Sequence, residues 1–279
     1  MSKKIVIAVF CCFALFICYR VEQNVYSGNT YAELKERLVN QRAEEKENMS
    51  DNTVKTLSEE ATVENLSTDP KSQEKIAYLT FDDGPSEITK TNLKTLKDNG
   101  AVATFFLIGS QVTDETKPIL KEMLKNGNAI GVHTYSHEGS TMYCSKEAYL
   151  EDFNKAYKVI KEITGVETKI WRFPWGSANS YIRSYGNEVI SELEAKGFNY
   201  YDWNVTAEDS VGHPTAYSIM QNINKDYKKY NHPVILMHDS KCNELTARLL
   251  PQIIKQLKDA GYSFDTVDHM DKPLQWSRD

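Results

Sequence analysis

The chain has 279 residues, of which 41% are hydrophobic and 26% are charged, a composition that can bury a full globular core. Its formal net charge is -6 at pH 7. Because phosphate binding needs a basic face, this charge excludes nucleic acid as an expected partner. We therefore expect one large domain with appended segments.

The first residues carry a membrane-targeting pattern. Lys3 and Lys4 precede an unbroken apolar run from Ile5 to Tyr19, and Arg20 follows it. Positive charge before an apolar stretch is typical of an export signal or a membrane anchor. No small-x-small cleavage site follows, so the sequence favours an uncleaved, single-pass anchor at residues 1–22 over a cleaved signal peptide. The remaining chain would then be extracellular, at the cell membrane.

Residues 23–74 are polar. Tyr31 to Asn48 can form a charged helix, whereas Met49 to Gln73 lack apolar periodicity, which is typical of a disordered stalk. We expect this segment to tether a folded domain at residues 75–279 to the membrane.

From Lys75 onward, short apolar runs alternate with amphipathic stretches. The runs predict strands at Ile76-Phe81, Ala103-Ile108, Ala129-Val132, Lys169-Phe173, Asn199-Trp203, Val234-Met237 and Ser263-Val267. The stretches predict helices at Thr89-Asn99, Asp114-Asn126, Lys146-Thr164, Glu188-Lys196, Thr215-Tyr230 and Leu245-Ala260. A glycine follows five of these stretches, where a helix C-terminal cap needs positive φ. The five are Gly100, Gly127, Gly165, Gly197 and Gly261. About seven βα repeats predict a parallel sheet with helices outside it, either an open doubly wound sheet or a barrel.

Ionisable residues gather at or just after the carboxyl ends of several predicted strands, which is the edge where βα folds build active sites. These residues are Asp82, Asp83, His133, His137, Arg172, Asp202, Asp209, His238 and Asp239. Their recurrence on separate strands indicates a site more strongly than any one pair does, since a single pair of histidines is often only surface or satisfied core.

Two histidines and two aspartates in this set predict a metal centre. His133 and His137 are four residues apart, which on a helical turn puts both imidazoles within reach of one ion. Asp82 and Asp83 are adjacent at a strand end, so one carboxylate can bind metal while the other handles a proton. A face of two histidines and one aspartate leaves positions open for water and substrate, as catalytic zinc sites require.

Four motifs, in chain order, resemble the signatures of the polysaccharide deacetylase family, the NodB-homology domain of carbohydrate esterase family 4. They are Thr80-Phe81-Asp82-Asp83-Gly84, His133-Thr134-Tyr135-Ser136-His137, Arg172-Phe173-Pro174-Trp175-Gly176 and Leu236-Met237-His238. The resemblance covers about Lys75 to Val267. It implies an α/β fold, a distorted (β/α)7 barrel related to the TIM barrel, and a hydrolase that removes acetyl groups from a polysaccharide. It also implies one divalent metal ion, commonly zinc and sometimes cobalt.

The resemblance also implies roles for matching residues. Asp83, His133 and His137 would hold the metal ion. Asp82 would be the general base that deprotonates a metal-bound water, and Arg172 would orient this base.

Three further positions complete the implied machinery. His238 would be the general acid that protonates the leaving nitrogen. The backbone N–H of Trp175 would stabilise the oxyanion, and Leu236 would line the pocket for the acetyl methyl group.

One motif departs from the family pattern, which in many members reads Asp-x-x-Asp-Trp, with the second Asp supporting the catalytic histidine. The nearest match, residues 206–210, preserves only Asp209. We therefore expect Asp209 to be the partner of His238, with Asp202 as the alternative. Trp203 would replace the missing tryptophan in the pocket wall.

The anchor and stalk favour a cell-wall glycan as the substrate, because they would present a monomeric catalytic domain to the wall. N-acetylglucosamine of peptidoglycan is the first expectation. Chitooligosaccharide, poly-N-acetylglucosamine and acetylxylan are alternatives with similar chemistry. A different class of function is an inactive barrel that binds wall glycan, but such a barrel usually lacks the base, a metal ligand or the acid, and none is missing here.

Two cysteines lie beyond the expected anchor. Cys144 follows His137 by seven residues, and Cys242 follows His238 by four. Since these histidines are expected to converge, the two cysteines are candidates for a disulfide bridge, which needs Cα atoms about 4.4–6.8 Å apart. Two free thiols are the alternative.

Overall fold

The computed structural model describes residues 74–278. The expected anchor and all of the stalk but Glu74 lie outside these residues. Within the described range, no helix is both long enough and apolar enough to cross a membrane.

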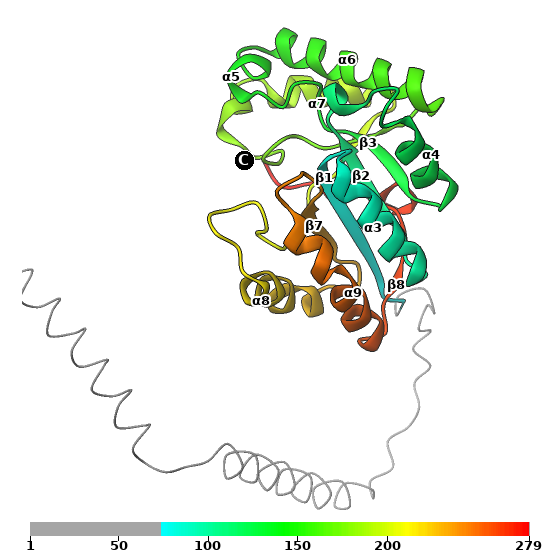
Figure 1. The fold of residues 1–279 in the computed structure, drawn as a ribbon. Coiled ribbons are helices and arrows are strands. Elements are labelled where there is room, and N and C mark those ends of the chain that lie inside the picture. The colour runs from blue at the N-terminus through cyan, green and yellow to red at the C-terminus, as the bar shows by residue number, and fades with distance from the viewer. Residues whose placement is uncertain (1–73, 279) are drawn as a thin grey trace, which may run out of the picture. The chain divides into compact units, whose positions relative to one another are not determined.

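One parallel sheet of eight strands organises residues 74–278 (Figure 1). The strands are β1 (Ile76–Gly84), β2 (Ala103–Leu107), β3 (Ala129–Val132), β4 (Ile170–Trp171), β5 (Asn199–Tyr200), β6 (Val205–Thr206), β7 (Val234–His238) and β8 (Ser263–Phe264). Their order is β5-β4-β3-β2-β1-β7-β6, and β8 pairs with the start of β1. Each strand pair is parallel. The α/β class predicted from the alternating pattern is therefore confirmed.

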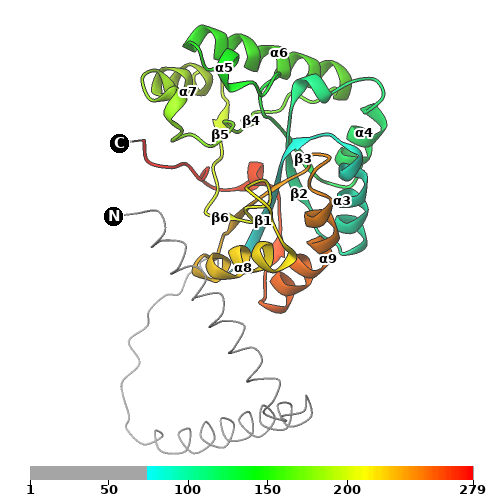
Figure 2. The same ribbon diagram turned by 60° about the vertical axis from the view of Figure 1, so that its left-hand side comes forward.

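Helices form an arc around one side of the sheet (Figure 2). They are α3 (Glu87–Asp98), α4 (Lys117–Lys125), α5 (Gly139–Met142), α6 (Lys146–Thr164), α7 (Gly186–Glu194), α8 (Ala216–Asp226) and α9 (Glu244–Asp259). The longest, α6, begins at Ser145, whose side chain accepts a hydrogen bond from the Ala148 N–H, and ends at Gly165 with φ of 78°. The other four predicted glycine caps also have positive φ.

The core lies between the sheet and these helices. All five residues of β2 are buried: Phe105 and Leu107 belong to this core, and Phe106 belongs to a second buried cluster with Tyr78, Ile170 and Val234, so both faces of the strand are covered. Phe81 of β1 stacks on Phe105 of β2 with ring centroids 5.1 Å apart. From the outside, α9 buries Leu250, Ile253 and Leu257 against this layer. The site residues lie on β1 and β7 of this packed layer and on loops that follow the other strands.

The sheet does not close into a full barrel. Within residues 74–278, β5 and β6 lie at opposite edges and no ladder joins them. The predicted parallel βα repeats are present, but the predicted closed barrel is wrong, because the structure is an α/β half-barrel. The run predicted as one strand, Asn199-Trp203, ends at Tyr200, and β6 is a separate strand of two residues.

Candidate active site

A cavity of about 430 Å³ lies at the carboxyl ends of the strands, where the sequence predicted a site. Its lining residues are Asp82, Asp83, His133, His137, Trp175, Trp203, Thr206, Glu208, Ser210, Val211, Leu236 and His238. The two other predicted site residues, Arg172 and Asp209, are buried and hydrogen-bonded to lining residues. The structure thus brings all ten predicted metal, catalytic and substrate-binding residues together.

Asp82 and Asp83 both reach this cavity because β1 is irregular between them. In a regular strand, successive side chains point to opposite faces. Here the register of β1 against β2 shifts between Asp82 and Gly84, and Asp83 has φ of 73°. This bulge lets two adjacent carboxylates line one cavity.

The candidate metal centre consists of Asp83, His133 and His137. Asp83 Oδ1 lies 3.3 Å from His137 Nε2 and 3.6 Å from His133 Nε2. One ligand atom from each residue lies within 4.8 Å of the other two. Asp83 Oδ1 is buried and accepts no hydrogen bond among the described residues, a costly state for a carboxylate oxygen that lacks a cation. The donor set and this unpartnered oxygen therefore fit a divalent metal ion.

The two histidines do not lie on a helical turn, contrary to the expectation from their spacing. Residues 133–138 form an irregular loop in which Thr134 and His137 have φ of 66° and 57°. Asp152 of α6 holds this loop by accepting hydrogen bonds from the backbone N–H groups of residues 135 and 136. Sequence reasoning missed Asp152, because it is one acidic residue among several on a regular amphipathic helix.

The environment of His133 favours metal binding. Its Nδ1 lies 3.0 Å from the Arg172 carbonyl oxygen, so Nδ1 carries the proton and the Nε2 lone pair is free for a ligand role. Burial lowers the pKa of His133 to about 4, although the charges of Asp82 and Asp83 oppose this shift. His133 is therefore neutral at physiological pH, as a metal ligand must be.

Arg172 fixes the orientation of Asp82. The fully buried guanidinium donates from Nη1 to Asp82 Oδ1 at 2.9 Å and to Thr80 Oγ1 at 2.8 Å. Its Nε and Nη2 donate to the backbone carbonyls of residues 201 and 202 at 2.8 and 3.1 Å. With Oδ1 held in this way, Asp82 Oδ2 lies 3.7 Å from His133 Nε2, beside the candidate metal centre.

His238, on β7 beside Asp82 of β1, contacts Asp209. His238 Nδ1 lies 2.8 Å from Asp209 Oδ1, and the His238 N–H donates to Asp209 Oδ2 at 3.0 Å. Thr246 Oγ1 also donates to Asp209 Oδ2, at 2.7 Å. Burial alone lowers the pKa of His238, but the hydrogen bond and charge of Asp209, together with the charges of Asp82 and Asp83, outweigh it. The net effect raises the pKa to about 9.

Asp202, the alternative partner of His238, binds other groups. Its carboxylate accepts hydrogen bonds from Ser177 and from the Trp276 N–H. Trp203 does line the cavity, as expected. Ser210, at the position where many family members have tryptophan, places its Oγ 3.3 Å from His238 Nε2.

Backbone strain is concentrated around this cavity. Five residues other than glycine have φ in the left-handed region within residues 74–278, and they are Asp83, Thr134, His137, Trp175 and Glu208. Each lines the cavity or directly follows a lining residue. Such a conformation costs on the order of 1–3 kcal/mol and occurs chiefly where function requires it. This pattern independently marks the cavity as a functional site.

Exposed aromatic rings flank the metal centre. Trp175 is 50% exposed and Tyr181 is 56% exposed, and their ring centroids are 5.6 Å apart. The Trp175 ring also lies 5.1 Å from the ring of His137. Exposed aromatic faces beside a polar site offer a stacking surface for a sugar ring.

The candidate disulfide is not formed, and the structure has the alternative of two free thiols. Cys144 and Cys242 are both free and exposed. They lie on segments that leave β3 and β7, which β2 and β1 separate, so the strand axes are roughly 14 Å apart at about 4.8 Å per strand.

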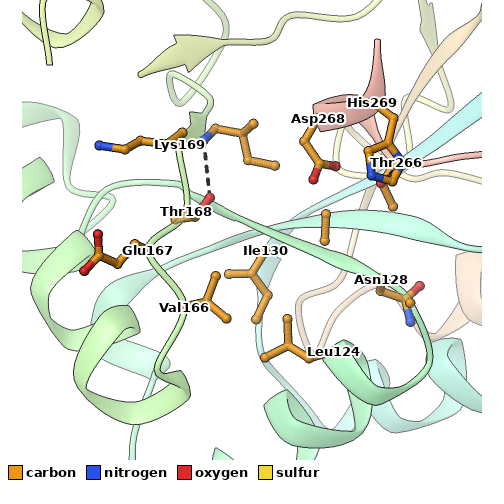
Figure 3. Close-up of a pocket in the computed structure, with 13 residues that line it drawn as sticks. Leu124, Asn128, Ile130, Val166, Glu167, Thr168, Lys169, Thr266, Asp268 and His269 are labelled. Atoms are coloured by element: carbon orange, nitrogen blue, oxygen red, sulfur yellow. Dashed lines mark hydrogen bonds between the residues drawn. The ribbon is translucent and has the colours of Figure 1, made fainter. Parts of the chain in front are cut away.

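A second cavity, of about 420 Å³, lies at the other end of the strands (Figure 3). The apolar side chains of Leu124, Ile130 and Val166 face one another there, and Thr168 Oγ1 accepts a hydrogen bond from the Ile170 N–H at 3.3 Å. Among the described residues, the only cluster of three metal-ligating side chains lies in the first cavity. The chemistry therefore belongs to the carboxyl edge of the sheet.

Comparison with known proteins agrees with this geometry. Residues 69–192 match the family described as polysaccharide deacetylase. The chain is 32% identical over 228 residues to a peptidoglycan-N-acetylglucosamine deacetylase of Bacillus cereus, covering 77% of this chain and 79% of that protein. It is 34% identical over 207 residues to a bifunctional xylanase/deacetylase of Pseudobutyrivibrio xylanivorans, covering 74% of this chain and 32% of that protein.

Solved structures show the same likeness. The catalytic domain of a peptidoglycan N-acetylglucosamine deacetylase from Eubacterium rectale superimposes with a TM-score of 0.69 at 29% identity. The match covers 78% of this chain and 98% of that domain.

Proposed function

This chain belongs to the polysaccharide deacetylase family, and we propose that it hydrolyses the N-acetyl group of N-acetylglucosamine in peptidoglycan at the outer face of the cell membrane. One observation carries the proposal. The Asp83–His133–His137 cluster, the Asp82–Arg172 pair and the His238–Asp209 pair all meet at one cavity.

We propose zinc as the metal, with cobalt or another divalent ion as the alternative, because two imidazoles and one carboxylate are a usual ligand set for catalytic zinc. Asp83, His133 and His137 would hold the ion. When bound, it supplies Lewis acidity that lowers the pKa of a water ligand and polarises the acetyl carbonyl.

The proton-transfer roles follow from the two hydrogen-bonded pairs. Asp82 Oδ2 accepts a proton from the attacking water, while Arg172 holds Oδ1 and prevents the carboxylate from rotating. His238 is protonated at neutral pH because its pKa is about 9, and its Nδ1–H bonds to Asp209. Its Nε2–H then donates to the nitrogen as the C–N bond breaks, which releases acetate and a free amine.

The remaining wall residues bind the acetyl group. The Trp175 N–H donates to no protein group among the described residues, so it is available to the developing oxyanion. Leu236 and Trp203 provide apolar surface for the acetyl methyl group. The exposed ring of Trp175 stacks on a sugar next to the cavity.

Peptidoglycan is favoured as the substrate by the Bacillus cereus and Eubacterium rectale relatives, which are named for action on it. The relative named as a xylanase/deacetylase makes acetylxylan the second candidate. Mass spectrometry of products from peptidoglycan fragments, chitooligosaccharides and acetylxylan would decide between them. We expect acetyl loss to be fastest from the glucosamine units of peptidoglycan fragments, and faster loss from acetylxylan would overturn the assignment.

The anchor proposal rests on the apolar run from Ile5 to Tyr19 and the polar stalk after it. We expect the full chain to sediment with membranes and to resist extraction by high salt, and a chain without residues 1–22 to remain in solution as a monomer. Recovery of the full chain in the soluble fraction would contradict an uncleaved anchor.

A further inference from the structure

The segment Leu274–Trp276 crosses the open side of the half-barrel, next to the residues that connect β5 to β6 (Figure 2). The Leu274 carbonyl accepts a hydrogen bond from the Asp202 N–H at 2.8 Å, and the Trp276 N–H donates to Asp202 Oδ2 at 2.9 Å. Trp276 Nε1–H donates to the Trp203 carbonyl at 2.7 Å. The segment therefore takes the position of a neighbouring strand where the sheet has none.

Asp202 connects this segment to the loop after β4. Its fully buried carboxylate forms no ion pair within residues 74–278. Instead, Oδ1 accepts the Ser177 N–H at 2.8 Å, and Oδ2 accepts the Ser177 Oγ–H at 2.6 Å as well as the Trp276 N–H. Removing any of these donors would leave a buried carboxylate oxygen with fewer partners, so the connection is stiff.

The turn that this connection holds has an unfavourable backbone. Trp175 has φ of 63° and Gly176 has φ of 81°. A bulky residue keeps a left-handed backbone only where the surrounding structure imposes it. The Trp276 ring packs on Gly176 so closely that a Cβ atom there would lie 2.5 Å from it. Trp276 and Asp202 thus constrain the turn, and neither of them lines the cavity.

The same residues support the arginine behind the general base. Arg172 Nη2 donates to the Asp202 carbonyl, and Nε donates to the carbonyl of Tyr201. The Asp202 N–H donates a hydrogen bond to the Leu274 carbonyl. The backbone carbonyls that accept from the Arg172 guanidinium are therefore held in place by the C-terminal segment.

We propose that Asp202, Leu274 and Trp276 form a positioning clamp that aims the Trp175 N–H at the oxyanion. The clamp acts on the transition state, so its loss lowers kcat and leaves substrate affinity and metal affinity nearly unchanged. This inference rests on the proposed function, in which the Trp175 N–H stabilises the oxyanion. It gives Asp202 a positioning role that is distinct from support of His238.

The test compares Asp202→Asn and the milder Ser177→Ala with Ser277→Ala, an exposed control next to Trp276. We expect Asp202→Asn to lower kcat by about 10- to 100-fold, with KM and metal affinity within about twofold of wild type. A phosphonamidate mimic of the tetrahedral intermediate should lose affinity by the same factor as kcat/KM, whereas the deacetylated product should not. Ser177→Ala should show the same pattern more weakly, and Ser277→Ala should match wild type.

Amide hydrogen exchange at residues 173–179 provides a readout that needs no catalysis. Exchange there should speed up in Asp202→Asn and stay unchanged in Ser277→Ala. If kcat and exchange both match wild type, the clamp does not exist. If kcat, metal affinity and melting temperature fall together while KM rises, Asp202 is merely structural. A wild-type protein that releases no acetate would refute the proposed function instead, and the exchange result would still decide whether the clamp holds the turn.

Discussion

Asp82 and Asp83 are neighbours in the chain, but their carboxylates have different partners. Asp82 is bonded to Arg172, whereas Asp83 faces two imidazoles and has an unpartnered oxygen. We therefore expect Asp82→Asn to lower turnover by ~10² to 10⁴ while metal stoichiometry is kept. Asp83→Asn should lose metal affinity, because one of three ligands becomes an amide. Metal analysis of both variants tests these roles. If Asp82→Asn lost the metal, the assignment of base and ligand would have to be reversed.

The His238–Asp209 pair makes a prediction about pH. A general acid works only while protonated, so activity should fall as pH rises through the pKa of His238, which Asp209 raises. In Asp209→Asn the charge that raises this pKa is gone and the lowering effect of burial remains. The alkaline limb of the kcat/KM profile should then move to lower pH. The matched variant Asp202→Asn should leave this limb in place, and a shift there instead would make Asp202 the partner.

At the scale of single residues, the sequence was informative about chemical type and less so about contacts. The order of the motifs predicted which residues would share the cavity. It favoured Asp209 over Asp202 as the partner of His238 only through a partial motif match. Asp202 follows β5 and Asp209 follows β6 at the same edge of the sheet, and their contacts in three dimensions separate the two. The spacing of His133 and His137 suggested a helical turn, whereas two left-handed residues and Asp152 shape the loop.

Asp239, just after β7, ties that strand to the start of α3. Its carboxylate accepts hydrogen bonds from Thr89 Oγ1–H at 2.6 Å and Asn92 Nδ2–H at 2.8 Å, and its N–H donates to the Asp82 carbonyl. Gly84 is required opposite it, since a Cβ there would lie 2.6 Å from Asp239 Oδ2. Burial raises the pKa of Asp239 to about 7, helped by the charge of Asp83 and opposed by the two hydrogen bonds.

This raised pKa predicts a pH-dependent stability. The unfolded carboxyl titrates near ~3.9, so between this pH and about 7 the folded state binds more protons than the unfolded state. The contribution of Asp239 to the free energy of unfolding should therefore fall as pH rises through that window, by on the order of 1.4 kcal/mol per pH unit at most. It should be constant above about pH 7.

Denaturant unfolding of metal-free wild type and Asp239→Asn, at several pH values from 5 to 8, measures this contribution. The advantage of wild type over the variant should shrink as pH rises. Parallel stability curves for the two proteins would show that Asp239 keeps an ordinary pKa.

At the scale of elements, long periodic segments were predictable and very short ones were not. The helix predicted at Lys146-Thr164 coincides with α6, because Ser145 and Gly165 mark both ends in the sequence. The two-residue strand β5 was predicted as part of a longer strand, Asn199-Trp203, and the two-residue strand β6 and the single turn α5 were missed. Elements of two to four residues are too short to show a period, and their existence depends on tertiary pairing.

At the scale of the whole molecule, the βα alternation predicted the sheet and the edge that carries the site, but not the degree of closure. Closure depends on whether the two last strands reach each other, and no local pattern encodes that distance. In the half-barrel, β5 and β6 stay apart and the segment Leu274–Trp276 covers the side between them. The cavity therefore relies on a segment far from its motifs in the sequence, which motif analysis did not reveal.

The central claim is that the cavity at this edge is a metal-dependent deacetylase site. The most direct test is mass spectrometry of N-acetylglucosamine-containing peptidoglycan fragments incubated with the purified chain, before and after chelation. We expect acetyl loss that stops when the metal is removed and resumes when zinc or cobalt is added back, because Asp83, His133 and His137 alone cannot activate water. Full activity from protein shown by elemental analysis to be metal-free would contradict the account.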